Sequence, residues 1–215
     1  MLAKKLVIFT TFTASLAFSE IQPREATTGD LILGLEKWAG AYSKNARYIG
    51  NLQFSDTEEF TAGEIPLWLT TVNMMNSVAE EVSIYAEEFE KYWRESPISE
   101  HAGREIAKVF KTFCDKQCQY FGRLVALRSK LEGLEKAPFF HELEKNMDSC
   151  LANVEGAQAE LYVSIEDAVS ADKTRDSKAI LLNVNNAYDI FTVSILEVVS
   201  AWKERPESPP CTRAV

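Results

Sequence analysis

The sequence predicts an all-α protein, an antiparallel bundle of four long helices preceded by a shorter N-terminal helix. From Thr28 onward, apolar residues recur every three or four positions rather than every two, which is the period of a helix. Glycine and proline gather in a few short stretches that separate long apolar stripes. The connections of ~3–8 residues between these stripes are typical of antiparallel neighbours in a bundle.

The first helix is expected over residues 29–50, with Thr28 or Asp30 as its N-terminal cap. Gly50-Asn51 marks its end. Its apolar stripe consists of Leu31, Leu35, Trp38, Tyr42 and Ile49.

A second segment is expected to start near Ser55, with a break or kink in the stretch 63–66, which contains a glycine and a proline. The long helix that continues from about Pro66 to Glu95 is expected to stop at Ser96-Pro97. Its stripe consists of Leu69, Val72, Met75, Val78, Val82, Tyr85, Phe89 and Tyr92.

Ser99 is the expected N-cap of the third long helix, in which Gly122 and Gly133 are weak points. The stripe of this helix includes one polar residue and consists of Ile106, Val109, Phe113, Gln117, Tyr120, Leu124, Leu127 and Leu131. The fourth helix is expected to begin at Pro138, since proline is tolerated in a first helical turn. Its stripe is Phe140, Leu143, Met147, Cys150, Val154, Ala157, Leu161, Ile165 and Ala168.

The fifth helix is expected from about Thr174 to Trp202, with Pro206 closing it. Its stripe is Ile180, Val184, Ala187, Phe191, Ile195, Val198 and Trp202. A single bundle domain over 20–205 and a proline-rich tail over 206–215 follow from this reading.

Residues 1–19 are typical of a secretory signal peptide, with Lys4 and Lys5 before a short apolar run and small residues at Ala17 and Ser19. The alternative, a membrane anchor, needs about 20 apolar residues, and this run is shorter. The protein is therefore expected to be secreted, in the extracellular space or at a cell wall. No later segment is expected to span a membrane.

The chain of 215 residues is acidic, with a formal net charge of −9, which the loss of Lys4 and Lys5 with residues 1–19 would change to −11. A nucleic-acid partner is not expected, because binding phosphates requires clustered lysine and arginine. With 46% apolar and 11% aromatic residues, the chain has ample material for a folded core.

Four cysteines in a secreted chain favour disulfides, and three pairings are open: the candidates are Cys114, Cys118, Cys150 and Cys211. Cys114 and Cys118 share one helix face, so a neighbouring helix is expected to present Cys150 to either, with Cys211 as the remaining partner. No metal site is expected, because His101 and His141 do not stand beside the cysteines at zinc-ligand spacing.

No catalytic residues are predicted, and neither is a cofactor, so the protein is expected not to be an enzyme. The serines lack the glycines of a nucleophile elbow, and His141 lacks a second histidine four positions later, where Lys145 stands. The acidic pairs Glu80-Glu81 and Glu87-Glu88 are expected on solvated helix faces, since no calcium-loop glycine accompanies them.

The apolar faces of the helices are wide, which is compatible with a large core, an internal cavity for an apolar ligand, or a surface that adsorbs. Apolar stripes of this kind most often do no more than form the hydrophobic core. If a pocket is present, its expected wall, chosen by stripe position, is Leu69, Met75, Val78, Phe113, Leu161, Phe191 and Ile195.

Several segments between residues 70 and 200 are similar to a known family. The run FGRLVALRSK at 121–130 is followed by Lys-Ala-Pro at 136–138. The further matching positions are Leu143, Leu161, Ile165, Ala179, Leu182, Phe191 and Ile195. These segments resemble the fungal hydrophobic surface-binding protein A and cell-wall galactomannoprotein family. The resemblance implies a secreted helical domain that adsorbs to hydrophobic surfaces or binds fatty acids inside the bundle, and it implies no catalytic residues.

We therefore expect a secreted, non-enzymatic bundle whose partner is an apolar ligand, such as a fatty acid or lipid, or a hydrophobic surface. The alternative is a secreted bundle that binds a protein partner through its acidic outer faces, as an inhibitor or a host-directed effector.

Overall fold

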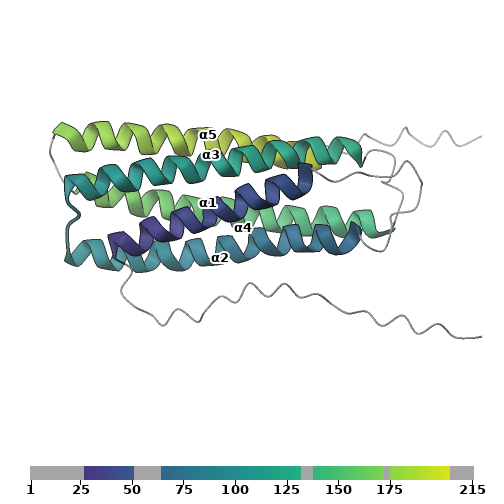
Figure 1. Cartoon of the computed structure of the whole chain (residues 1–215), viewed down its shortest axis with the longest axis horizontal. Helices are drawn as coiled ribbons and strands as arrows, with labels where there is room; N and C mark the ends of the chain where they lie inside the picture. The colour runs from purple at the N-terminus through teal and green to yellow at the C-terminus, as the bar shows by residue number, and fades with distance from the viewer. Residues whose placement is uncertain (1–26, 51–63, 132–137, 172–174, 204–215) are drawn as a thin grey trace, which may run out of the picture.

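The protein folds into five helices that run up and down along one long axis (Figure 1), as seen in a computed structural model that describes residues 27–50, 64–131, 138–171 and 175–203. The helices are α1 (Thr28–Gly50), α2 (Glu64–Glu95), α3 (Glu100–Lys130), α4 (Pro138–Ser170) and α5 (Arg175–Lys203). The helix α1 has 23 residues and the others have 29 to 33. The predicted fold class, four long helices preceded by a shorter one, is confirmed.

The helices form a ring, in which α3 packs against α1 and α5, and α4 packs against α2 and α5. The ring closes where α1 meets α2, and this is its most sparsely packed boundary between neighbours. Figure 1 shows why, since α1 crosses obliquely over the bundle while the other four helices run along it. The interior of the ring is therefore shared by side chains from all five helices.

The predicted apolar stripes form this interior. The five stripe residues of α1, the eight of the α3 stripe and the seven of α5 are all buried, with Leu131 at the C-cap of α3. All of them except the polar Gln117 belong to one continuous hydrophobic core. In α2 and α4 the partly buried members are Tyr85, Tyr92 and Leu143, which pack against the core from its edge. The side chains of Leu69 and Phe140 lie outside the described part of the chain. Helical periodicity thus identified the core because each helix buries one face.

The cap of α1 is Thr27, whereas the sequence prediction placed it at Thr28 or Asp30. The Asp30 backbone N–H donates to Thr27 Oγ1 at 3.3 Å, and the Thr27 backbone N–H donates to Asp30 Oδ2 at 3.0 Å. This reciprocal pair is a capping box, in which an aspartate takes the place of the more usual glutamate. The predicted start was one residue late because Thr27 and Thr28 are equally good caps by composition.

Ser99 caps α3 as predicted, with its hydroxyl oxygen accepting from the Ala102 backbone N–H at 3.2 Å. We expect Ser99→Ala to lower the free energy of unfolding by about 1 kcal/mol, because the first turn loses a partner for one of its exposed amides. Urea denaturation followed by circular dichroism measures this change. The exposed Ser149 inside α4 is the control, since Ser149→Ala should be neutral or slightly stabilising. Equal losses for both variants would contradict the capping role.

The signal peptide predicted at 1–19, the segment near Ser55 and the tail at 206–215 lie outside the described residues, so these predictions remain untested. The helix α5 corrects another prediction, that no later segment is long and apolar enough to cross a membrane. Residues 176–202 meet both criteria, with a mean hydropathy of 1.3 in the most apolar window. One side of α5 nevertheless belongs to the core of the bundle, as its seven buried stripe residues show.

Candidate functional site

The candidate pocket residues lie in the packed core. Phe113, Leu161, Phe191, Ile195 and Met75 are fully buried, and Val78 is 5% exposed. They come from α2, α3, α4 and α5 and belong to one cluster, so the stripes do bring them together. The seventh, Leu69, lies in α2, with its side chain outside the described part.

A cluster of aromatic rings fills the interior between α1, α3 and α5. The ring of Tyr42 lies 5.2 Å from that of Tyr120 and 5.9 Å from that of Phe113, measured between centroids. Phe121 continues the cluster at 6.0 Å from both Tyr120 and Phe191. Such tilted and edge-on pairs add to the stability that burial alone provides.

Three polar atoms within this apolar interior have no hydrogen-bonding partner in the described part of the chain. They are the hydroxyls of Tyr42 and Tyr120 and the side-chain oxygen Oε1 of Gln117. Both tyrosines are fully buried, and Gln117 is 1% exposed. Most buried polar groups in native proteins have a partner, so a group of three without one calls for an explanation.

These groups lie close together, because the rings of Tyr42 and Tyr120 are 5.2 Å apart and Gln117 stands one helical turn before Tyr120 on α3. Burial raises the pKa of Tyr42 well above its ordinary value, and the Gln117 amide opposes that rise without the geometry of a hydrogen bond. Burial likewise raises the pKa of Tyr120, with the Tyr42 hydroxyl and the Cys150 thiol adding to the rise. The polar cluster, as we call Tyr42, Gln117 and Tyr120, therefore lies inside the ring, next to Cys150 of α4.

The structure contradicts the predicted bonds among the three described cysteines, since Cys114, Cys118 and Cys150 are free there, and a bond to Cys211 stays a prediction. The reason is the packing of the ring, in which α3 and α4 scarcely touch. Cys150 faces α2 instead, where its Sγ donates to the Val72 carbonyl at 3.5 Å, while Cys118 Sγ is 3.8 Å from the Ile190 carbonyl of α5. The fourth candidate, Cys211, lies outside the described residues.

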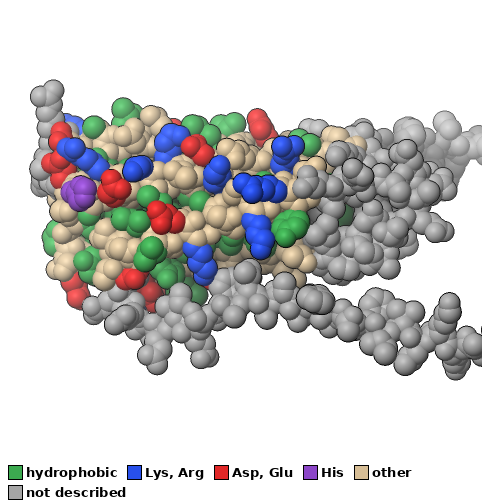
Figure 2. Space-filling model, in the orientation of Figure 1, with side chains coloured by type: hydrophobic (Ala, Val, Ile, Leu, Met, Phe, Trp, Pro, Cys, Tyr) green, Lys and Arg blue, Asp and Glu red, His purple; other side chains and the backbone are tan. Residues whose placement is uncertain are grey.

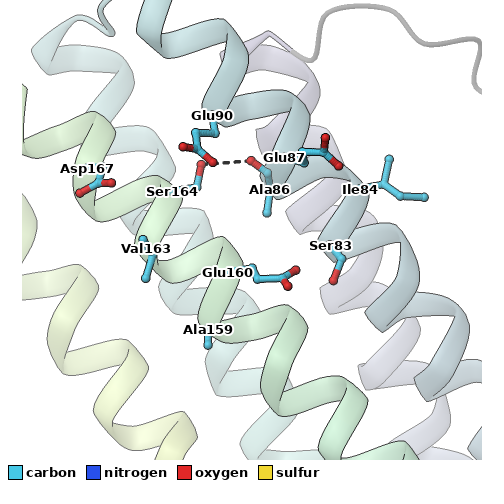
Figure 3. A pocket seen from close by; sticks show the side chains of 10 residues that line it. All are labelled: Ser83, Ile84, Ala86, Glu87, Glu90, Ala159, Glu160, Val163, Ser164 and Asp167. Atoms are coloured by element: carbon cyan, nitrogen blue, oxygen red, sulfur yellow. Dashed lines mark hydrogen bonds between the residues drawn. The ribbon is translucent and has the colours of Figure 1, made fainter.

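A groove of about 680 Å³ runs along the outside of the bundle between α2 and α4 (Figure 3). Ala86, Ala159 and the buried Ser164, whose hydroxyl donates to the Ala86 carbonyl at 3.2 Å, are among its lining residues. Four carboxylates also line it, namely Glu87, Glu90, Glu160 and Asp167. None of the six described candidate pocket residues is among its lining residues, and its charge makes it a poor site for an anionic ligand.

The boundary between α1 and α2 is held by a small polar contact. The indole N–H of Trp38 donates to Glu81 Oε2 at 2.8 Å, and Lys37 Nζ pairs with the same carboxylate at 3.1 Å. The ring of Trp38 also meets that of Tyr85 edge-on at 5.3 Å. Glu81 was predicted on a solvated face, but its side chain is only 19% exposed and joins two helices.

The outer face of α5 is apolar as well. Leu182, Ile190, Val193 and Leu196 are each about half exposed or more, and their spacing places them on one side of the helix, opposite the buried stripe.

The face formed by α1 and α3 differs, because basic, acidic and apolar side chains are mixed there (Figure 2). Its basic residues are largely paired, as Lys111 is with Asp115 at 2.7 Å. Within the described ranges, no three histidine, cysteine, aspartate or glutamate side chains gather into a possible metal site.

The fold and the interior together define the class of protein: an all-helical bundle with a buried polar cluster in a hydrophobic core. A solved structure has a similar fold, the crystal structure of AfMP4p, an Aspergillus fumigatus mannoprotein, in complex with palmitic acid. The two share 9% sequence identity at a TM-score of 0.59, and the match covers 80% of this chain and 99% of AfMP4p. No family model matches the sequence, and no curated protein does.

The sequence prediction missed the polar cluster as a site. It placed Tyr42, Gln117 and Tyr120 on core stripes and singled out none of them as a possible ligand contact. The available signal was Gln117, a glutamine at a stripe position whose neighbours on the same face are apolar.

Proposed function

We propose that this protein is a non-catalytic lipid-binding bundle that takes the apolar chain of a fatty acid or related lipid into its interior. The observation that carries the proposal is the polar cluster, which supplies hydrogen-bonding groups without a described partner at one place inside a largely apolar ring of helices. Pockets for apolar ligands have this composition, with few polar groups in an apolar wall. The palmitic acid bound by AfMP4p, a bundle of similar fold, supports the same proposal.

Ligand entry uses the boundary between α1 and α2 in this proposal, because that side of the ring has the fewest contacts to separate. Each buried methylene of a lipid chain contributes about 0.8 kcal/mol, so a long chain offsets a substantial rearrangement of core side chains. The groove between α2 and α4 is the weaker candidate, since four carboxylates line it.

Delipidated protein should bind a fluorescent fatty acid at one site and release it when unlabelled palmitic acid is added. Fluorescence titration measures both steps, with an inert helical protein of similar size as the control. Binding no stronger than that of the control would exclude the proposal.

Secretion is part of the same proposal. It rests on residues 1–19, which have the pattern of a signal peptide, and on the description of the structural neighbour as a mannoprotein. Mass spectrometry of the protein recovered from culture medium tests it. An N-terminus at Glu20 or close to it would support export, and an intact Met1 in material retained by cells would contradict it.

The exposed face of α5 favours a second candidate function, adsorption to hydrophobic surfaces. We expect the double variant Leu182→Asn and Val193→Asn to adsorb less to polystyrene, because it removes two of the four exposed apolar side chains on that face. Quartz-crystal microbalance measures the adsorbed mass. Leu33→Asn is the control, since Leu33 of α1 is 63% exposed and lies away from that face. Unchanged adsorption of the double variant would exclude this candidate function.

A pulldown tests the remaining alternative, a secreted bundle that binds a protein. A single stoichiometric protein partner from extracellular extract would favour that alternative.

A further inference from the structure

We infer that the polar cluster of Tyr42, Gln117 and Tyr120 binds an uncharged O–H group at the end of a lipid chain, as found in a long-chain alcohol or a protonated fatty acid. The inference rests on the proposed function and specifies its ligand. It selects against the carboxylate form of a fatty acid.

The hydrogen-bonding capacity of the cluster fits a hydroxyl group. The oxygen Oε1 of Gln117 only accepts, and no group in the described part of the chain donates to it, so it is open to a donor from a ligand. Each tyrosine hydroxyl both donates and accepts, so either donates to the ligand oxygen. An O–H group supplies one donor and one acceptor at a single atom, and thereby satisfies Gln117 and one tyrosine together. A carboxylate has no donor for Gln117 Oε1.

The charges around the cluster also favour an uncharged ligand group over a carboxylate. The titratable neighbour of Tyr42 and Tyr120 from outside the cluster is the Cys150 thiol of α4, and Tyr188 of α5 stacks on Phe191 at the far side of the aromatic rings; neither is a cation. On the α2 side of Cys150, the Val72 carbonyl accepts from its thiol at 3.5 Å.

The nearest buried cation lies elsewhere along α3. Arg128 stands eight residues beyond Tyr120, about 12 Å along the helix axis, and faces Glu144 at 4.0 Å. A carboxylate at the polar cluster would therefore lose its hydration without gaining a positive partner, whereas an uncharged O–H group loses far less.

Twelve-carbon ligands test the inference, because 1-dodecanol and dodecanoic acid share a chain and differ only in the polar end. Their affinities are measured directly by isothermal titration calorimetry at pH 5.5 and pH 7.5, without a carboxylate probe. We expect the affinity for dodecanol to be the same at both values. The affinity for dodecanoic acid should fall by about tenfold per pH unit above the pKa of its carboxyl group, because only the protonated form binds.

Substitutions locate the binding group. Gln117→Leu should weaken the binding of dodecanol about fivefold, which corresponds to one hydrogen bond of about 1 kcal/mol. Tyr42→Phe and Tyr120→Phe report which tyrosine is the donor. Tyr162→Phe is the matched control, since the Tyr162 hydroxyl is 3.3 Å from Asn185 Oδ1, outside the cluster, and the variant should bind as the original protein does. Circular dichroism confirms that each variant is folded.

The outcomes separate this inference from the proposed function. If no lipid binds, the proposed function fails. If dodecanoic acid binds equally well at both pH values, lipid binding stands and the inference is overturned. It is also overturned if Gln117→Leu, Tyr42→Phe and Tyr120→Phe all bind dodecanol as the original protein does, since the cluster then binds only internal water.

Discussion

Replacing Phe113 by alanine should lower the free energy of unfolding by about 3–5 kcal/mol, the usual cost of emptying a phenylalanine site in a packed core. Phe113 is fully buried, and its ring contacts those of Trp38 at 5.8 Å and Tyr42 at 5.9 Å. The variant therefore leaves a cavity beside the polar cluster. Guanidinium denaturation followed by tryptophan fluorescence and circular dichroism measures the loss.

The control for this prediction is Leu196→Ala on the exposed face of α5, where Leu196 is 54% exposed and the change should stay within about 0.5 kcal/mol. A loss below about 1 kcal/mol for Phe113→Ala would mean that the interior is loosely packed already. A ligand-bound sample adds a second readout, because a lipid that fills the interior should restore part of the lost stability.

Raising the pH from 9 to 12 should unfold the protein, because several buried groups that are neutral in the fold ionise once exposed. Burial raises the pKa of Cys150 from its ordinary value of 9.0 to about 12. The stability from the neutral thiol is complete below pH 9 and is lost as the pH approaches 12. Each pH unit in this window costs about 1.4 kcal/mol, so Cys150 alone costs roughly 3 kcal/mol at pH 11.

Other buried groups act in the same direction. The pKa of Cys114 is raised by burial and by the nearby Cys118 and Asp115, and those of Tyr42 and Tyr120 are raised chiefly by burial. Denaturation curves at each pH unit from 7 to 11 measure the combined slope. The double variant Cys150→Ala and Tyr42→Phe should show a shallower slope than the original protein. Identical slopes would show that surface ion pairs, such as that of Lys91 with Glu87, dominate the alkaline response instead.

The sequence was sufficient to predict the helices and their buried faces. Ser99 and Pro138 mark helix starts through local chemistry, a capping hydroxyl and a proline in the first turn, which does not depend on the rest of the fold. The stripe of α3 was predicted residue by residue for the same reason, since the helical period alone decides which side chains share a face.

Contacts between helices were the part that the sequence did not predict. The bond expected from Cys114 or Cys118 to Cys150 required α3 and α4 to be neighbours, and the order of helices around the ring separates them. Glu81 has the same local sequence features as the solvated acids near it, and only the crossing of α1 brings Trp38 to its carboxylate. The polar cluster likewise depends on α1 and α3 lying together, which a single stripe does not reveal.

The sparsely packed boundary between α1 and α2 has a kinetic consequence. If α1 swings away from α2 as a unit, the interior opens at the cost of few contacts, while α3, α4, α5 and α2 keep theirs. For the proposed lipid ligand, the exchange rate is then expected to depend on how often the contacts of Trp38 and Lys37 with Glu81 and Tyr85 break, and not on global unfolding. Under that proposal, changes at this boundary should alter mainly the residence time of the ligand, and changes in the polar cluster mainly its affinity.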